Sequence, residues 1–229
     1  MARGALVVLE GPEGVGKTTQ ARLLADALCS AGVACISVRE PGGTALGESV
    51  RGLLLDGEHA PVAAAEALLF LASRAQLMAD VVRPALARGD VVVVDRFFLS
   101  TYAYQIAGRG LDEGAVRAAN QLAVNGVIPD VTIVLALPDV RDGMARAAER
   151  GAQDRMERAD DAFHARVAAA FDRYATTAWQ HENAECGTIE RVSAEGTPED
   201  VFARVAAVVS RHVPSLVDVL AARSNEVSA

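Results

Sequence analysis

The chain has 229 residues, of which 51% are hydrophobic and 23% are charged, and this balance excludes general disorder. A chain of this length buries enough surface to need no disulfide or metal ion to hold its core. Its 22 basic and 30 acidic residues give a net charge of −8, which argues against a broad nucleic-acid-binding face.

The sequence gives no sign of a membrane or secreted protein. No apolar run approaches the ~20 residues that cross a bilayer, and the first apolar run begins too early to leave room for a signal peptide. The three cysteines, Cys29, Cys35 and Cys186, form no metal-binding or disulfide pattern, which favours free thiols in a reducing compartment. We therefore expect a cytoplasmic protein that binds neither membranes nor nucleic acid.

Short apolar runs alternate with longer helical patterns along the chain. Because the runs are apolar throughout, they predict buried strands at Ala5–Glu10, Val33–Val38, Val91–Asp95, Val131–Ala136 and, less clearly, Thr188–Val192. The helical patterns cover Lys17–Ala31, Thr44–Asp56, Pro61–Arg88 with a kink or break at Pro84, Asp112–Asn125, Val140–Arg150, Asp160–Gln180 and a last helix opened by Thr197 and Pro198. This alternation predicts an α/β fold, a five-stranded parallel sheet with helices on both faces.

Gly11-Pro-Glu-Gly-Val-Gly-Lys-Thr18 matches the phosphate-binding pattern GxxxxGK[ST], between a predicted strand and a predicted helix. Its glycines permit a turn whose N–H groups surround phosphate oxygens, Lys17 adds a charge for the β- and γ-phosphates, and the Thr18 hydroxyl suits Mg²⁺. Lys17 is also the single lysine among the 22 basic residues. The motif predicts binding of ATP with Mg²⁺ by Gly11, Pro12, Glu13, Gly14, Val15, Gly16, Lys17, Thr18 and Thr19.

This motif alone is compatible with a kinase, a switch GTPase or an ATPase. A guanine-specific switch needs an Asn-Lys-x-Asp element, which a chain without a second lysine does not have. At the end of the third predicted strand, Asp95 and Arg96 suit two tasks: the acid organises Mg²⁺ and its water, and the arginine binds a second phosphate. A second phosphate predicts a phosphorylated acceptor.

Further motifs appear in an order and spacing that resemble the bacterial thymidylate kinases over about residues 5–210. They are Gly11–Thr18, Arg39–Thr44, Arg51–Asp56, Phe70–Gln76, Asp95-Arg96, Ser100–Gln105 and Arg150–Arg158. The resemblance implies a P-loop nucleoside-monophosphate kinase fold, in one domain over residues 1–213 with a short lid at about 150–158 and a peripheral tail at 214–229. It also implies transfer of a phosphoryl group from ATP to dTMP in dTTP synthesis, and a homodimer for which the helix at Pro61–Arg88 could provide the face.

The resemblance assigns acceptor-binding residues. It implies that Phe70 stacks on thymine, that Arg74 donates to the O4 carbonyl, and that Thr101 and Gln105 complete the base edge. Tyr104 would exclude a ribose 2′-hydroxyl, Glu13 would accept from the 3′-hydroxyl, and Arg51 with Arg96 would hold the phosphate, with Arg39 a weaker candidate. By composition alone, Arg51 is better explained as a solvated arginine and Phe70 as a core residue. Thr101, Tyr104 and Gln105 are also compatible with ordinary packing on a surface helix.

On the donor side, the resemblance implies that Arg155 of the lid reaches the transferred phosphoryl group, because the phosphate loop has no arginine of its own. Arg155 would then act with Lys17, Arg96 and Asp95, while Arg146 stacks on adenine. Leu137 departs from the acid that relatives often have there, and Glu40-Pro41 is where they tend to have a cis peptide. Two alternatives stay open: a kinase for another nucleotide or a deoxynucleoside, and a non-catalytic P-loop protein.

Overall fold

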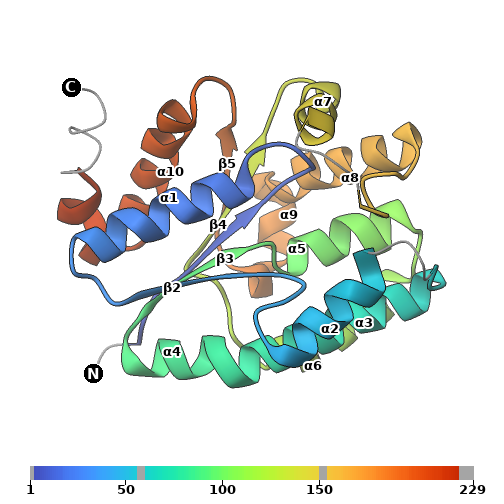
Figure 1. Cartoon of the computed structure of the whole chain (residues 1–229), viewed down its shortest axis with the longest axis horizontal. Coiled ribbons are helices and arrows are strands. Elements are labelled where there is room, and N and C mark those ends of the chain that lie inside the picture. Colours follow the sequence, from blue (N-terminus) through green and yellow to red (C-terminus); the bar gives the residue numbers. More distant parts are fainter. Residues whose placement is uncertain (1–2, 56–59, 150–153, 222–229) are drawn as a thin grey trace.

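The computed structural model describes residues 3–55, 60–149 and 154–221. Within these residues, five parallel strands form one sheet in the order β2-β3-β1-β4-β5 (Figure 1). The strands are β1 (Leu6–Glu10), β2 (Cys35–Arg39), β3 (Val91–Asp95), β4 (Val131–Ala136) and β5 (Ile189–Ser193). The predicted five-stranded parallel sheet is confirmed.

Helices follow each strand and return the chain to the start of the next one, as parallel strands require. They are α1 (Lys17–Ser30), α2 (Ala45–Leu55), α3 (Ala63–Leu77), α4 (Arg83–Arg88), α5 (Phe98–Thr101), α6 (Glu113–Val124), α7 (Val140–Glu149), α8 (Asp161–Tyr174), α9 (Thr177–Glu182) and α10 (Pro198–His212). The chain also has two π-helical turns, Met78–Val82 and Tyr102–Gly108, and two 3₁₀ turns, Ala184–Cys186 and Pro214–Leu216.

Side chains of the central strands alternate between two hydrophobic clusters, one on each face of the sheet. Val7, Leu9 and Ile133 face α1 and α10 in one cluster, while Leu6 and Val8 belong to the other, with residues from the π-helical turns and α8. Figure 1 shows the same division, with α1 and α10 on one side of the sheet and α3, α4, α6 and α8 on the other. Both faces of β1, β3 and β4 are therefore covered, which explains why these strands are apolar throughout.

Three predictions about elements need correction. The strands at the two edges, β2 and β5, are only partly buried, because each has a neighbour on one side alone. The helix predicted at Asp160–Gln180 is two helices. The first ends at Tyr174, and the Thr176 hydroxyl caps the second by accepting from the N–H of Trp179 at 3.3 Å. The tail is not peripheral as far as residue 221, because Leu216 and Leu220 are buried against α1 and α10.

The predicted interruption at Pro84 is confirmed as a π-helical turn, Met78–Val82, directly before α4. Proline has no N–H to donate within the helix, and the wider turn accommodates it. Within the described residues, no helix combines the length and apolar character that a bilayer crossing needs.

The chain passes directly from β1 into the phosphate loop, which α7 covers closely. A Cβ at Gly14 would lie 1.7 Å from the backbone oxygen of Gly143 in α7, and a Cβ at Gly143 would lie 2.4 Å from the backbone oxygen of Glu13. The loop and the first turn of α7 are thus in backbone contact, and this contact needs glycine on both sides. Gly14 also has a positive φ of 71°, which glycine adopts without strain.

Gly143→Ala tests this contact. In an open helix the substitution would stabilise the protein by about 0.5–1 kcal/mol. Here we expect destabilisation of about 1–3 kcal/mol, because the new methyl group meets backbone atoms that cannot rotate away. We also expect weaker binding of ATP, since the displaced atom belongs to the phosphate loop. Thermal unfolding and the KM for ATP measure the two effects.

Gly114→Ala in α6 is the matched control, because its Cβ would have only an ordinary 3.4 Å contact with Asp112. We expect this variant to be at least as stable as the wild type. Equal stability of the two variants would show that the contact between the loop and α7 is not tight.

Candidate active site

The phosphate loop joins the buried end of β1 to the start of α1. Gly11, Gly14 and Gly16 all have positive φ values, 134°, 71° and 92°, so the loop adopts a turn that other residues would enter only with strain. Backbone N–H groups in such a turn point into a common hollow, and α1 adds the positive end of its helix dipole. The loop predicted as a phosphate site therefore has the conformation that this role requires.

Lys17, the first residue of α1, bends back over the loop. Its Nζ donates to the backbone oxygens of Gly11 at 3.0 Å and Pro12 at 2.5 Å, and only 6% of the residue is exposed. Burial, with the positive charge of Arg96 nearby, lowers the pKa of Lys17 to about 8. A desolvated cation of this kind interacts strongly with any phosphate that enters the loop.

Asp95, at the carboxyl end of β3, lies beside the loop. The Thr18 hydroxyl donates to Asp95 Oδ2 at 2.5 Å, while Oδ1 is buried and has no hydrogen-bond partner in the described part of the chain. A buried carboxylate oxygen without a donor is costly, and a hard cation or its water would satisfy it. The residues predicted to hold Mg²⁺ therefore fit that ion, although no group of three or more acidic, histidine or cysteine side chains gathers in the described residues to hold a metal alone.

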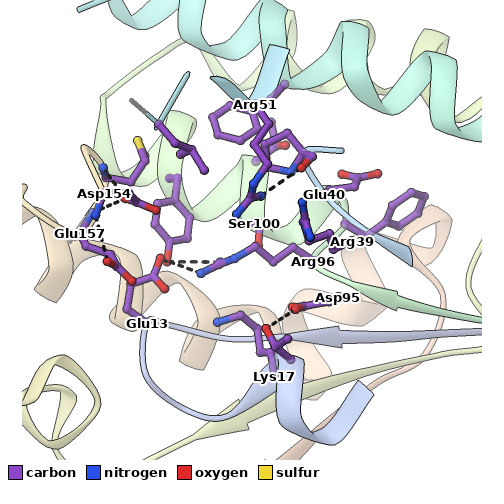
Figure 2. Close-up of a pocket in the computed structure, with 18 of the residues that line it drawn as sticks. Glu13, Lys17, Arg39, Glu40, Arg51, Asp95, Arg96, Ser100, Asp154 and Glu157 are labelled. Carbon is purple, nitrogen blue, oxygen red and sulfur yellow. Dashed lines mark hydrogen bonds and ion pairs between the residues drawn. The ribbon is translucent and has the colours of Figure 1, made fainter. Parts of the chain in front are cut away.

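Arg96 and Glu13 form an ion pair that connects β3 to the phosphate loop (Figure 2). Arg96 Nη2 donates to Glu13 Oε1 at 2.6 Å, and the Tyr104 hydroxyl donates to the same oxygen at 2.9 Å. Burial alone would raise the pKa of Glu13, but the charges of Arg96 and Lys17 outweigh it and hold this pKa at about 2. Arg96 has a positive φ of 70°, so its backbone conformation is sparsely populated for a residue with a side chain.

Glu10, the last residue of β1, orients the segment that contains Arg96. Its carboxylate is fully buried and accepts from the N–H groups of Phe97 at 2.8 Å and Ser100 at 2.9 Å and from the Ser100 hydroxyl at 2.5 Å. These bonds connect the end of β1 to the start of α5, which follows β3. Sequence reasoning missed this residue, although an acid that ends an apolar strand was the available signal.

A cavity of about 360 Å³ extends from the phosphate loop to α3. This volume is within the range of small-molecule sites, roughly 300–1,000 Å³. It brings together all of the side chains predicted for the acceptor and the metal, and Lys17 with them: Glu13, Lys17, Thr18, Arg39, Arg51, Phe70, Arg74, Asp95, Arg96, Thr101, Tyr104 and Gln105. These predicted residues come from five separate parts of the sequence and line one hollow.

Phe70 and Arg74 lie one turn apart on α3 at the wall of this cavity. Phe70 is half-buried and belongs to neither hydrophobic cluster, so its ring does not serve the core. Arg74 is 1% exposed; its Nε and Nη2 donate to Glu40 Oε2 at 2.8 and 2.5 Å, and its Nη1 donates to Asn120 Oδ1 at 2.7 Å. Glu40 and Asn120, which the sequence analysis did not select, hold the guanidinium in one orientation.

Thr101, Tyr104 and Gln105 are buried, so they are not part of a surface helix. Gln105 Nε2 donates to Glu66 Oε1 at 3.0 Å, and Glu66 is a further buried carboxylate that sequence reasoning missed. Arg51 donates from Nη1 to the backbone oxygen of Pro41 at 3.1 Å, next to the cis peptide that the family resemblance implied at Glu40-Pro41.

Arg39 is half exposed and pairs with Glu48 at 3.0 Å. Arg146 is exposed at the surface of α7, where its Nη1 donates to the backbone oxygen of Ala194 at 3.4 Å. Arg155 does not line the cavity, and its side chain bonds to Leu54 and Glu66. The roles of these arginines stay predictions.

Several other predicted positions contribute backbone or lie outside the described residues. The side chain of Val15 is in the core, so only its backbone is available to a nucleotide. Leu137, where an acid was expected, packs against the cluster beside α1 and borders a smaller hollow behind the loop. Asp56 and residues 150–153 of the lid lie outside the described residues.

The parallel sheet carries a phosphate loop at its edge, and the cavity beside this loop is lined by several arginines and by Phe70. These features are those of a P-loop kinase of nucleoside monophosphates. Comparison with known proteins gives the particular family. The family model described as Thymidylate kinase matches residues 9–195. The chain therefore belongs to the thymidylate kinase family and is an enzyme that phosphorylates a nucleotide.

Individual relatives agree with this assignment. The chain is 47% identical to the thymidylate kinase of Synechococcus sp. (strain JA-2-3B'a(2-13)) over 91% of this chain and 95% of the relative. It is 45% identical to that of Pseudomonas syringae pv. syringae over 87% and 92%. The crystal structure of thymidylate kinase from Ehrlichia chaffeensis superposes with a TM-score of 0.72 at 28% identity, covering 90% of this chain and 99% of that one.

The ion pair of Glu13 predicts a pH dependence of stability. Its folded pKa of about 2 lies below the ordinary 4.5, so the contribution to stability is complete above about pH 4.5 and is lost as the pH falls toward 2. The full difference corresponds to about 3 kcal/mol. We expect wild type to exceed Glu13→Gln in stability at neutral pH, and this difference to narrow as the pH falls from about 4.5 toward about 2.

Urea unfolding of both proteins at several pH values measures this difference. A difference that stays constant over the whole range would show that Glu13 does not hold a depressed pKa.

Proposed function

We propose that this chain transfers the γ-phosphoryl group of ATP to dTMP, which gives dTDP. The observation that supports it is that Lys17, Asp95 and Arg96 share one cavity with Phe70 and Arg74. Lys17, Asp95 and Arg96 suit a polyphosphate and an acceptor phosphate. Phe70 and Arg74 suit a flat base with a keto oxygen. A cavity that has phosphate-binding groups at one end and base-binding groups at the other holds two nucleotides with their phosphates toward each other.

The reaction needs no covalent intermediate on the protein. An oxygen of the dTMP phosphate attacks the γ-phosphorus in line with the leaving ADP, and catalysis comes from positioning and neutralisation of charge. The loop N–H groups and Lys17 hold the donor phosphates. Arg96 and Arg51 hold the acceptor phosphate, with Arg39 in a lesser role because Glu48 already occupies it.

Mg²⁺ fits the pair Thr18 and Asp95, since Asp95 Oδ1 is buried without a partner in the described structure. Thr18 and Asp95 are the protein groups that would hold the ion. The ion would supply positive charge that offsets the negative charge developing on the donor phosphates during transfer.

Thymine is favoured over cytosine by the chemistry of Arg74. A guanidinium only donates hydrogen bonds, so it pairs with a keto oxygen and rejects an amino group at the same place. Glu40 and Asn120 use three of its donors and so fix the direction of the others. The ring of Phe70, free of the core, is available to stack on the base.

We also propose a homodimer in the cytoplasm. Large apolar side chains are exposed on α2, α3 and α6, namely Leu46, Leu53, Leu68 and Leu122, and α3 packs against both of the other two helices. Leu122 is 84% exposed and Leu68 62%, which is unusual for a surface that faces only water. The free thiols of Cys29, Cys35 and Cys186 are compatible with a reducing compartment.

The activity is tested by release of ADP from ATP with dTMP, dUMP, dCMP, dGMP, AMP or thymidine as the acceptor. We expect turnover with dTMP, much less with the other acceptors, and none after EDTA removes Mg²⁺. No turnover, or a preference for another acceptor, would contradict the proposal.

Phe70→Ala tests the base site separately. Stacking of a base on an aromatic ring contributes about 1–3 kcal/mol, so we expect the KM for dTMP to rise by about tenfold or more. The KM for ATP and the melting temperature should not change, since Phe70 is outside the core. Equal losses of both nucleotides would show that Phe70 has only a structural role.

Leu122→Glu tests the dimer. A charge buried in an apolar interface has no compensating partner, so we expect this variant to sediment as a monomer at micromolar concentration while the wild type sediments as a dimer. A wild-type monomer under the same conditions would contradict the proposed assembly.

A further inference from the structure

Arg155 points away from the cavity, whereas the residues around it in the sequence face it. Asp154, Met156 and Glu157 all line the hollow. The Arg155 side chain instead donates from Nε to the backbone oxygen of Leu54 at 2.9 Å and from Nη2 to Glu66 Oε2 at 2.6 Å. Its side chain is only 17% exposed, so it is held between α2 and α3 rather than extended into solvent.

Glu66 accepts hydrogen bonds from three side chains in two distant segments, Gln105 and Arg109 in one and Arg155 in the other. It is 1% exposed, and its oxygens accept from Gln105 at 3.0 Å, from Arg109 at 3.1 Å through two nitrogens, and from Arg155. Burial alone would raise the pKa of Glu66, but the hydrogen bonds from Arg109, Gln105 and Arg155 lower it, so the carboxylate keeps its charge.

The same carboxylate thus connects two walls of the acceptor cavity. Gln105 is a cavity residue on the π-helical turn, and Met156 is a cavity residue of the segment 154–158. The sulfur of Met156 is 3.5 Å from Arg155 Nη2 and 3.7 Å from Arg109 Nη2, so its place in the wall depends on both arginines. Loss of either bond to Glu66 would let this wall shift.

We propose that Arg155 is a positioning residue, which ties residues 154–158 to Glu66 and thereby fixes the wall of the acceptor site, and that it does not supply a charge to the transferred phosphoryl group. This inference rests on the proposed function. It replaces the role that the family resemblance implied for Arg155.

Energetic considerations support this positioning role of Arg155, which we call the anchor. To reach the donor phosphates, Arg155 would have to leave a buried carboxylate and a backbone oxygen, and breaking a buried ion pair is strongly unfavourable. The charge near the phosphates is already supplied by Lys17 and Arg96, which line the cavity. Arg155 therefore acts by holding the wall of the acceptor site in place.

The experiment compares steady-state kinetics of full-length wild type, Arg155→Ala, Glu66→Gln and the double variant, with ATP and dTMP varied in turn. We expect each single variant to raise the KM for dTMP by about tenfold, with kcat changed by less than about threefold. We expect the double variant to be no worse than the poorer single variant, because both changes break the same contact. Arg158→Ala, an exposed arginine in the same segment, should behave as the wild type.

A fall of about 10³-fold in kcat for Arg155→Ala with an unchanged KM for dTMP would overturn the anchor, because that is the signature of an arginine at the phosphoryl group. Multiplication of the two single effects in the double variant would overturn it as well. If circular dichroism shows that Glu66→Gln does not fold, the kinetics of Arg155→Lys take its place. One ammonium group cannot bind both Leu54 and Glu66 as the guanidinium does, so the KM for dTMP should be raised while kcat stays as in the wild type. A lowered kcat with an unchanged KM for dTMP would overturn the anchor.

Wild-type turnover of dTMP in the same assay separates this inference from the proposed function. If the wild type phosphorylates dTMP but the variants do not show the expected changes in KM and kcat, only the anchor is refuted.

Discussion

The ion pair between Glu13 and Arg96 holds the site together, because it joins the phosphate loop after β1 to the residue that follows β3. Parallel neighbours in a sheet bring their carboxyl ends to one edge, and here that edge carries Glu10, Asp95 and Arg96 next to the loop. The pairing keeps a carboxylate among phosphate-binding groups in its charged state. It also fixes the Arg96 guanidinium in the lining of the cavity.

Buried carboxylates organise the rest of the site in the same manner. Glu10 orients the start of α5, Glu40 orients Arg74, and Glu66 gathers donors from two further segments. Each is almost completely removed from water, and each is stabilised by hydrogen bonds from groups far away in the sequence. Burial of a charge is tolerable only with such partners, so these acids define the positions of the side chains around them.

The sequence predicted those features that depend on interactions between residues close together in the chain. The phosphate loop, the central strands and the cap at Thr197 depend on neighbours in the chain, and local patterns indicated them correctly. Glu40 and Glu66 bind partners 34 to 89 residues away, and a single sequence has no signal for such pairs. Arg155 is an example of what the sequence could not predict. Its residue type suggested a cation that binds phosphate, whereas its side chain points toward Glu66 in another helix.

The single lysine of the chain lies in the phosphate loop with a pKa of about 8, and this has a practical consequence. Apart from the α-amino group, Lys17 Nζ is the one primary amine available to an acylating or aldehyde reagent. Covalent labelling at mildly alkaline pH would therefore modify a single side-chain atom, which lies in the phosphate loop, and protection of that atom would follow occupancy of the loop without any engineered probe.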